Sequence, residues 1–360
     1  MQRKMARSAP PSPFGPPGEA AVVRAASLAC QNAVKGKNSC YLRSHPRNPA
    51  LGSIMTPSKL VKRLRIDDPD RFRLAAFDPA DTGGLDKDDA QALLADDVKR
   101  LAELQQRLYA DGRWALLIVL QGMDAAGKDG VIDHVMTGLN PQGCSVHAFK
   151  APSEEELSHD FLWRAAVRVP EQRRIGIFNR SHYEETLVVR VHPELLERQK
   201  LPPQLVGKNI WKERFQDIRK FERHLARSGV AVLKFFLHVS REEQRQRLLE
   251  RLEQPAKRWK FSMTDIAERK LWDKYMAAYE DMLRGTSREF APWYVVPADR
   301  RWFARLTVAR ALTETLDSLD LQFPRVEGAA LKELEQVRAM LEAEGREHVD
   351  ANTPSTSKDR

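Results

Sequence analysis

The chain contains few cysteines, and this excludes two classes of small-protein architecture. Only Cys30, Cys40 and Cys144 occur among 360 residues. They are too few and too scattered for a disulfide framework or a cysteine zinc site. The histidines between residues 134 and 192 also lack the spacing of metal ligands. Because this cysteine usage suits a reducing compartment, we expect a cytoplasmic protein.

Long apolar runs are absent as well. No apolar stretch approaches the roughly 18 residues that indicate a transmembrane helix, so we expect no membrane partner. Acidic residues are scarce at the N-terminus, where residues 1–54 hold eight Lys and Arg against Glu19 alone, a balance of +7. Because the formal net charge is +9, the other 306 residues carry only +2. We therefore expect no nucleic-acid partner, and any polyanion site must be a local cluster.

Composition divides the chain into three parts. Residues 1–54 are rich in Pro, Ser, Ala, Gly and Arg without a sustained period, which predicts a disordered basic tail. An organelle transit peptide and a natural start at Met55 are the two alternatives for this segment. Residues 55–325 have the composition of a globular domain, and residues 326–360 are expected to form a polar helix followed by a disordered tail.

A phosphate-binding loop is the strongest local signal. The buried-strand pattern of residues 114–120 is followed by GMDAAGK at 122–128 and then by apolar residues at helical spacing, Val131, Val135 and Leu139. Gly122 and Gly127 permit a backbone whose N–H groups point at phosphate oxygens, helped by the helix N-terminus. Lys128 adds a mobile positive charge. An ordinary strand-to-helix turn is the alternative.

The loop differs from the usual pattern at two positions. Asp129 stands where a Ser or Thr would supply a hydroxyl for magnesium, and Asp124 places a negative charge inside the loop. A carboxylate there would repel phosphate unless a metal ion lay between them. We infer that Asp124 takes over metal binding.

The remaining strand patterns predict the fold class. Strand-like segments at 145–149, 174–178, 230–239 and 293–296 are separated by helical sequence. This alternation predicts a three-layer α/β domain, with a parallel sheet, helices on both faces and a ligand site at the carboxyl ends of the strands. Amphipathic helices are expected at 86–109 and 302–319.

Two further motifs follow predicted strands. In residues 174–185, Asn179 occupies the place where an acid usually holds the metal, and Arg180 could bind a phosphate through two donors. A polar turn without a ligand is the alternative. In residues 240–262, Arg247 and Arg251 share a helix face, and basic residues follow a proline. This segment, with a span of about 240–275, could be a helical lid over the site or a solvated helix.

Six separated motifs follow one another along the chain. They are GMDAAGKDG (122–130), LNPQG (139–143), FKAPS (149–153), HDFLWR (159–164), FNRSHYEE (178–185) and EQPAKRWKFS (253–262). Together and in this order they resemble the polyphosphate kinase type 2 family, and the resemblance covers residues 61–319. It implies a P-loop kinase fold. The motifs most resemble the family's class III branch, whose members use inorganic polyphosphate to phosphorylate nucleoside mono- and diphosphates.

The resemblance implies a role for each matching residue. It implies Mg²⁺, or Mn²⁺, held by Asp124 and Asn179, and a homo-oligomer, either a dimer or a tetramer. Nucleotide contacts are implied at Asn179, Glu184 and Glu185, although other branches carry Asp at position 179 and Asn-Arg at 184–185. The implied catalytic residues are Asp124, Lys128, Arg180, Arg247 and Arg251, and the implied phosphate contacts are Gly122, Met123, Ala125, Ala126, Gly127, Lys128, Asp129, Lys257 and Lys260.

Two other functions remain open from the residues alone. An ATP-dependent kinase of nucleotides or another small molecule would need a similar loop and lid. The missing Ser or Thr after Lys128 argues against it. A non-catalytic polyanion-binding protein could retain the loop as a scaffold, but it would not need Asp124, Lys128, Arg180 and the arginines Arg247 and Arg251 together.

Overall fold

The structure is a computed structural model that describes residues 57–351. The predictions for residues 1–54, including a start at Met55, and for the tail after residue 351 lie outside the described residues. Two compact units are present, one ending at Leu321 and one beginning at Gln322. The second unit contains helix α14 (Ala329–Ala351), where the sequence predicts a polar helix.

A five-stranded parallel sheet forms the centre of the first unit, as predicted. Its strands have the order β2-β3-β1-β4-β5, and every neighbouring pair is parallel. All five lie within one or two residues of the predicted segments. Their bounds are β1 (Ala115–Gln121), β2 (Cys144–Ala148), β3 (Ile175–Asn179), β4 (Val230–His238) and β5 (Trp293–Pro297).

Strand register brings the predicted site residues to one edge of the sheet. All seven residues of β1 are buried, as expected for a central strand covered on both faces. Leu120 of β1 pairs with Asn179, and Gln121 pairs with Phe236 of β4. The segments that follow β1, β3 and β4 therefore begin side by side, where a ligand binds in folds of this kind.

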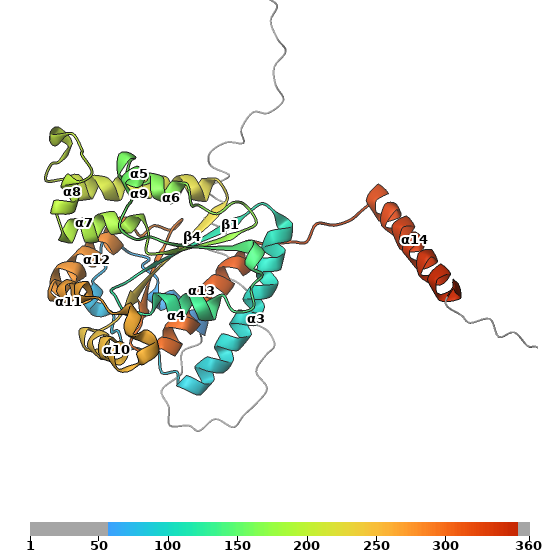
Figure 1. Ribbon diagram of the computed structural model, residues 1–360, viewed down its shortest axis with the longest axis horizontal. Coiled ribbons are helices and arrows are strands. Elements are labelled where there is room, and N and C mark those ends of the chain that lie inside the picture. The colour runs from blue at the N-terminus through green and yellow to red at the C-terminus, as the bar shows by residue number, and fades with distance from the viewer. Residues whose placement is uncertain (1–56, 352–360) are drawn as a thin grey trace, which may run out of the picture. The chain divides into compact units, whose positions relative to one another are not determined.

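Helices cover both faces of the sheet, which confirms the predicted three-layer α/β class (Figure 1). On one face, α13 (Arg301–Ser318) contacts α3 (Lys87–Asp111) and α4 (Lys128–Val135). On the other face, α9 (Ile210–Arg227) contacts β4 and α12 (Trp272–Thr286). Helix α2 (Pro57–Leu64) packs against α13 and the edge strand β5.

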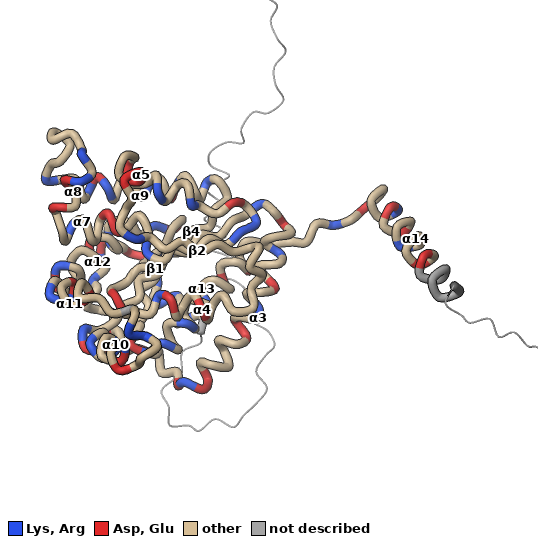
Figure 2. The backbone as a smooth tube through the Cα atoms, viewed as in Figure 1, with Lys and Arg blue, Asp and Glu red and all other residues tan. Residues whose placement is uncertain are grey.

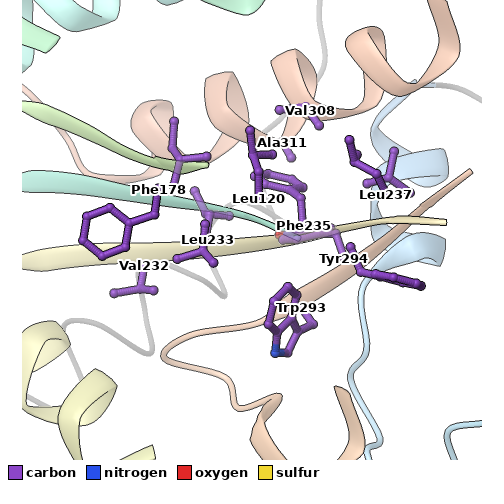
Figure 3. Close-up of a cluster of buried hydrophobic side chains, with 14 of the residues drawn as sticks. Leu120, Phe178, Val232, Leu233, Phe235, Leu237, Trp293, Tyr294, Val308 and Ala311 are labelled. Carbon is purple, nitrogen blue, oxygen red and sulfur yellow. The ribbon is translucent and has the colours of Figure 1, made fainter. Parts of the chain in front are cut away.

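Alternating side chains divide the core between the two faces. Val308 and Ala311 of α13 lie on the same side of the sheet as Leu120 and Phe235, whereas Trp293 lies on the opposite side (Figure 3). All five residues are at most 1% exposed. Both faces of β4 and β5 are therefore closed to solvent.

Short elements complete the first unit and carry much of the site. One difference from the sequence prediction concerns α4, which ends at Val135, so Leu139 reaches the core from a turn that contains Gly138 at a φ of +82°. No helix in the described part of the chain has the length and apolar character needed to cross a membrane. The other elements are η1 (Leu74–Ala76), η2 (Pro141–Gly143), α5 (Glu154–Ser158), α6 (Trp163–Ala166), η3 (His182–Thr186), α7 (Val188–Val191), α8 (Glu194–Glu197), η4 (Pro203–Leu205), α10 (Arg241–Glu253), η5 (Pro255–Lys260) and α11 (Met263–Lys270).

Candidate active site

The loop between β1 and α4 has the backbone that a phosphate-binding loop requires. Gly122 has a φ of +154°, and a Cβ there would lie 2.8 Å from the carbonyl oxygen of Leu237. Gly127, which precedes α4, has a φ of +107°. Both positions therefore need glycine. The loop closes through a 3.1 Å hydrogen bond from the Ala126 N–H to the Met123 carbonyl.

Lys128 begins α4, and its side chain folds back over the loop. Its ammonium donates to the carbonyls of Gly122 at 2.7 Å and Met123 at 3.1 Å. Burial, with a smaller effect of the Arg180 charge, lowers the pKa of Lys128 from 10.5 to about 8. Because both partners are neutral oxygens in a buried site, an incoming phosphate would be a more favourable partner for this charge.

The lowered pKa of Lys128 predicts a pH dependence for donor use. In the free enzyme Lys128 loses its proton as pH rises through about 8, so kcat/KM for a phosphate donor should fall above that pH. A bound phosphate favours the ammonium form, so kcat should begin to fall at a higher pH than kcat/KM does. Steady-state rates measured from pH 6.5 to 9.5 test this.

A variant in which Arg305 is replaced by Gln is a control for this profile, because guanidinium groups do not titrate in the range. Its kcat/KM should fall over the same pH range as that of the parent protein. A kcat/KM that stays constant up to pH 9.5 would contradict the assignment to Lys128.

Arg180 connects the loop to the end of β3. Its guanidinium pairs with the carboxylate of Asp124 and, at 3.1 Å, with that of Glu184. These two charges, Glu184 first, raise the pKa of Arg180 further above its usual range. Arg180 has a φ of +62°, a left-handed conformation that costs a non-glycine residue on the order of 1 kcal/mol. The two ion pairs offset this strain.

The candidate metal ligands are Asp124 within the loop and Asn179 at the end of β3. Asn179 ends β3 and donates from its amide nitrogen to Asp129 at 2.8 Å, which leaves its amide oxygen free of that bond. No group of three or more His, Cys, Asp or Glu residues able to hold a metal ion occurs among residues 57–351. The donor set nevertheless fits Mg²⁺, because this ion binds through one or two protein oxygens together with water and substrate phosphates.

Glu184 and Glu185 point to different places. Glu184 contacts Arg180, whereas Glu185 is buried and binds Arg214 at 3.2 Å and Gln199 at 2.5 Å. Burial raises the pKa of Glu185 despite the charge of Arg214. Glu185 lines a separate cavity of about 90 Å³ between α6 and α9. The structure therefore brings Glu184, but not Glu185, to the phosphate loop.

Arg247 joins the loop to the start of α13. Its guanidinium donates to the carbonyls of Ala125 at 3.0 Å and Ala126 at 2.9 Å, and to those of Ala298 and Asp299 at 2.5 and 3.1 Å. Its Nε donates to Glu243 at 2.7 Å. These contacts hold the loop against the end of β5.

Arg251, one helical turn further along α10, lines the same cavity as the loop and lies in the segment predicted to be a lid. It pairs with Asp265 of α11 at 3.2 Å. Burial, and then the nearby charge of Asp124, raise the pKa of Asp265. Of the predicted basic contacts in η5, Lys257 lines the same cavity as Arg251, whereas the side chain of Lys260 lies outside what the structure describes.

A cavity of about 530 Å³ extends from the phosphate loop between α4, α10 and α13. Figure 2 shows Lys and Arg residues along α10, together with acidic residues. The residues that line the cavity include eight basic and four acidic side chains. The basic ones are Lys128, Lys150, Arg180, Arg247, Arg251, Lys257, Arg301 and Arg305, and the acidic ones are Asp124, Asp129, Asp133 and Glu250.

Sequence reasoning missed four residues near this cavity. Arg301 and Arg305 follow β5 and lie four residues apart on α13, a signal comparable to that of Arg247 and Arg251. Asp265 had no signal, because its neighbours in sequence are ordinary helix residues. Tyr279 of α12 is buried, and its hydroxyl interacts with the backbone of Gly122.

Comparison with known proteins gives consistent results. The profile of "Polyphosphate kinase 2 (PPK2)" matches residues 84–324. An "ADP-polyphosphate phosphotransferase" of Rhodopseudomonas palustris is 52% identical over 256 residues, which are 71% of this chain and 89% of the relative. An "AMP/ADP-polyphosphate phosphotransferase" of Meiothermus ruber is 48% identical over 274 residues, or 76% of this chain and 98% of the relative.

A solved structure agrees with these sequence matches. The crystal structure of polyphosphate kinase 2 from Arthrobacter aurescens superimposes with a TM-score of 0.72 at 40% identity, covering 81% of this chain and 99% of the other. The profile match covers more than half of the chain, and both relatives are well above 30% identical to it. The chain belongs to the polyphosphate kinase 2 family.

Proposed function

We propose that the protein transfers a phosphoryl group from inorganic polyphosphate to nucleoside mono- and diphosphates, so that AMP and ADP become ADP and ATP. The observation that carries this proposal is the 530 Å³ cavity, which continues beyond the phosphate loop and is lined by eight basic side chains. A single terminal phosphate would need only the loop. A linear polymer of phosphates needs a longer track of positive charge.

The donor occupies the basic side of the cavity in this proposal. Its terminal phosphate lies in the loop, where backbone N–H groups and Lys128 contact it. The chain of phosphates continues past Lys257, Arg301 and Arg305. Arg301 is held at 2.8 Å by Glu250, so its position on this track is fixed in part by α10.

Asp124 and Asn179 would hold Mg²⁺, or Mn²⁺ in its place, and the ion would supply positive charge that screens the repulsion between the phosphates. Arg180, which pairs with Asp124 and Glu184, lies beside this position and contacts the phosphoryl group during transfer. Glu184 holds the other side of the guanidinium and keeps it close to the loop.

The reaction needs orientation and charge neutralisation more than proton transfer. The acceptor oxygen belongs to a nucleotide phosphate that is already anionic, so no strong general base is required. Arg180 and Arg251, which line the same cavity, contact the transferring group as the acceptor attacks in line with the leaving phosphate. Arg247 acts as a positioning residue, because its guanidinium is occupied by four backbone carbonyls.

A turnover assay tests this function and separates it from the alternatives. Purified protein with polyphosphate and Mg²⁺ should form ATP from ADP, and ADP and ATP from AMP. Product from ADP alone would keep the donor but reject the class III acceptor range. Turnover with ATP as donor and none with polyphosphate would indicate an ATP-dependent kinase, and no turnover with either would indicate a binding protein.

The track of positive charge predicts a defect that depends on the length of the donor. Arg305→Gln should raise KM several-fold for polyphosphate of about a hundred units and change kcat little, because Arg305 lies beyond the transferred phosphate. It should change KM less for the shortest donors. Rates measured with size-fractionated polyphosphate at two salt concentrations check this, because salt weakens polyanion binding.

Arg300→Gln is the matched control. Arg300 is exposed and precedes α13, and it does not line the cavity. Equal changes in KM for the two variants would show that net charge, rather than this track, determines donor binding.

A further inference from the structure

A buried cluster of charged and polar groups lies beneath residues 180–184, the side of the site to which we assign the acceptor nucleotide and which we call the acceptor side. Lys234 of β4 is 0% exposed and donates to Glu222 at 2.6 Å, to the hydroxyl of Tyr183 at 2.9 Å and to the carbonyl of Thr286 at 2.9 Å. The Tyr183 hydroxyl donates to the second oxygen of Glu222 at 2.6 Å. All three hydrogens of the ammonium are therefore used.

The cluster occupies a position where apolar residues would be expected. Lys234 lies on a central strand whose neighbours Leu233 and Phe235 are buried. Its ammonium is 5.2 Å from the ring centroid of Trp293, on the face opposite Phe235. Burial lowers the pKa of Lys234 to about 8 and raises that of Glu222. Apolar replacements of a buried ion pair are often equally stable or more stable, so stability alone does not account for this one.

One arm of the cluster holds the segment that follows β3. Tyr183 lies in η3, between Arg180 and Glu184 along the chain. Its hydroxyl is fixed by Lys234 and Glu222, and its ring packs on Trp293 at 5.0 Å. The hydroxyl of Ser181 accepts from the side chain of Gln121 at 3.1 Å. Buried contacts with β1, β4 and β5 thus fix this short segment, which includes the strained Arg180, to the sheet.

The other arm holds the end of α12. Thr286 is the last residue of α12, and its hydroxyl accepts a 2.9 Å hydrogen bond from the indole of Trp293. The same helix carries Tyr279, which interacts with Gly122 of the phosphate loop, and Tyr275, which donates to Glu268 of α11 at 2.6 Å. The cluster therefore joins the segment after β3 to the helix that follows the lid.

We propose that Lys234, Glu222 and Tyr183 form a positioning unit that fixes Arg180 and Glu184 relative to α12 and so sets the acceptor side of the active site. This inference rests on the proposed function. The donor track lies on α4, α10 and α13, which the three residues do not contact in the hydrogen bonds and ion pairs of the described chain. Loosening the unit should therefore raise KM for the acceptor. It should leave KM for the donor nearly unchanged, because donor binding depends mainly on the track formed by Lys257, Arg301 and Arg305.

Tyr183→Phe tests the proposal, because it removes one hydroxyl and keeps the ring. We expect kcat/KM for ADP to fall about tenfold, with KM for ADP raised and KM for polyphosphate within twofold of the parent value. Small displacements of positioning groups have effects of this size. A role confined to stability would lower the amount of folded enzyme without separating the two KM values.

Tyr294→Phe is the matched control. Tyr294 follows Trp293 on β5, is buried, and stacks on Phe235 on the other face of the sheet, 5.3 Å between ring centroids. It should leave both KM values and kcat unchanged. A Tyr183→Phe enzyme with the acceptor kinetics of the parent protein would overturn the proposal, as would equal changes in both KM values.

A second variant covers the case in which Tyr183→Phe does not fold. The triple replacement Tyr183→Phe, Glu222→Leu and Lys234→Met removes every side-chain member of the unit and leaves no buried side-chain charge unpaired. Its near-ultraviolet circular dichroism spectrum should be that of a folded protein, and it should show the same acceptor-specific defect. Full acceptor kinetics in the triple variant would reject the unit. Failure of the parent protein to use polyphosphate would instead reject the proposed function.

Discussion

Replacing Asp124 with Asn should lower kcat by at least two orders of magnitude and leave the fold intact. The change removes a negative charge at the candidate metal site and one of the two carboxylates that pair with Arg180. Asp124 is partly exposed and belongs to no apolar cluster, so little packing is lost. Turnover measured against Mg²⁺ concentration, with a thermal melt of the same sample, tests both parts of the expectation.

Asp133→Asn provides the matched control for charge. Asp133 lines the same cavity from α4, is exposed, and lies away from the loop. It should keep most of the activity and the Mg²⁺ dependence of the parent protein. If Asp124→Asn retained full turnover at ordinary Mg²⁺ concentrations, Asp124 would have no part in the reaction.

Replacing Lys128 with Met should also abolish most turnover, by at least a hundredfold, because no other ammonium lies inside the loop of the described chain. The folded variant should be no less stable than the parent protein. The lowered pKa of Lys128 indicates that burial disfavours its charged form when no phosphate is bound. The measurement is a melting curve with and without polyphosphate. The increase in Tm on adding polyphosphate should be large for the parent protein and small for the variant.

Lys99→Met on the exposed face of α3 is the control, because it removes the same charge far from the cavity. It should keep the polyphosphate-dependent increase in Tm. A Lys128→Met protein that was stabilised by polyphosphate as strongly as the parent would place the donor elsewhere.

The sequence was sufficient to predict the sheet because its signals are local. The apolar run of β1, the glycines of the loop and the alternation of strands with helices each depend on a few neighbouring residues. These signals predicted the strands to within two residues. The end of α4 was harder to predict, because the spacing of Val131, Val135 and Leu139 suits a helix although Gly138 adopts a left-handed turn.

The side-chain partners in the site could not be predicted from local patterns. Asp265 meets Arg251 only because α11 folds back on α10, and Arg247 meets the loop only because α10 passes over it. The two arginines share a helix face, yet one contacts backbone carbonyls and the other a carboxylate. Glu184 and Glu185 are adjacent in sequence but have different partners, Arg180 and Arg214, because successive side chains of η3 point in different directions.

The contacts of Arg247 also determine which part of the lid can move. Four hydrogen bonds join its guanidinium to the loop and to the end of β5, and Gln244 donates to the carbonyl of Asp124 at 2.9 Å. The first half of α10 must therefore move as one body with the phosphate loop. A hinge that opens the site has to lie beyond Arg247, toward the break at Pro255. In that case η5 moves, while the first half of α10 and the end of α11, which Arg269 bonds to Arg241 and Gln244, stay in place.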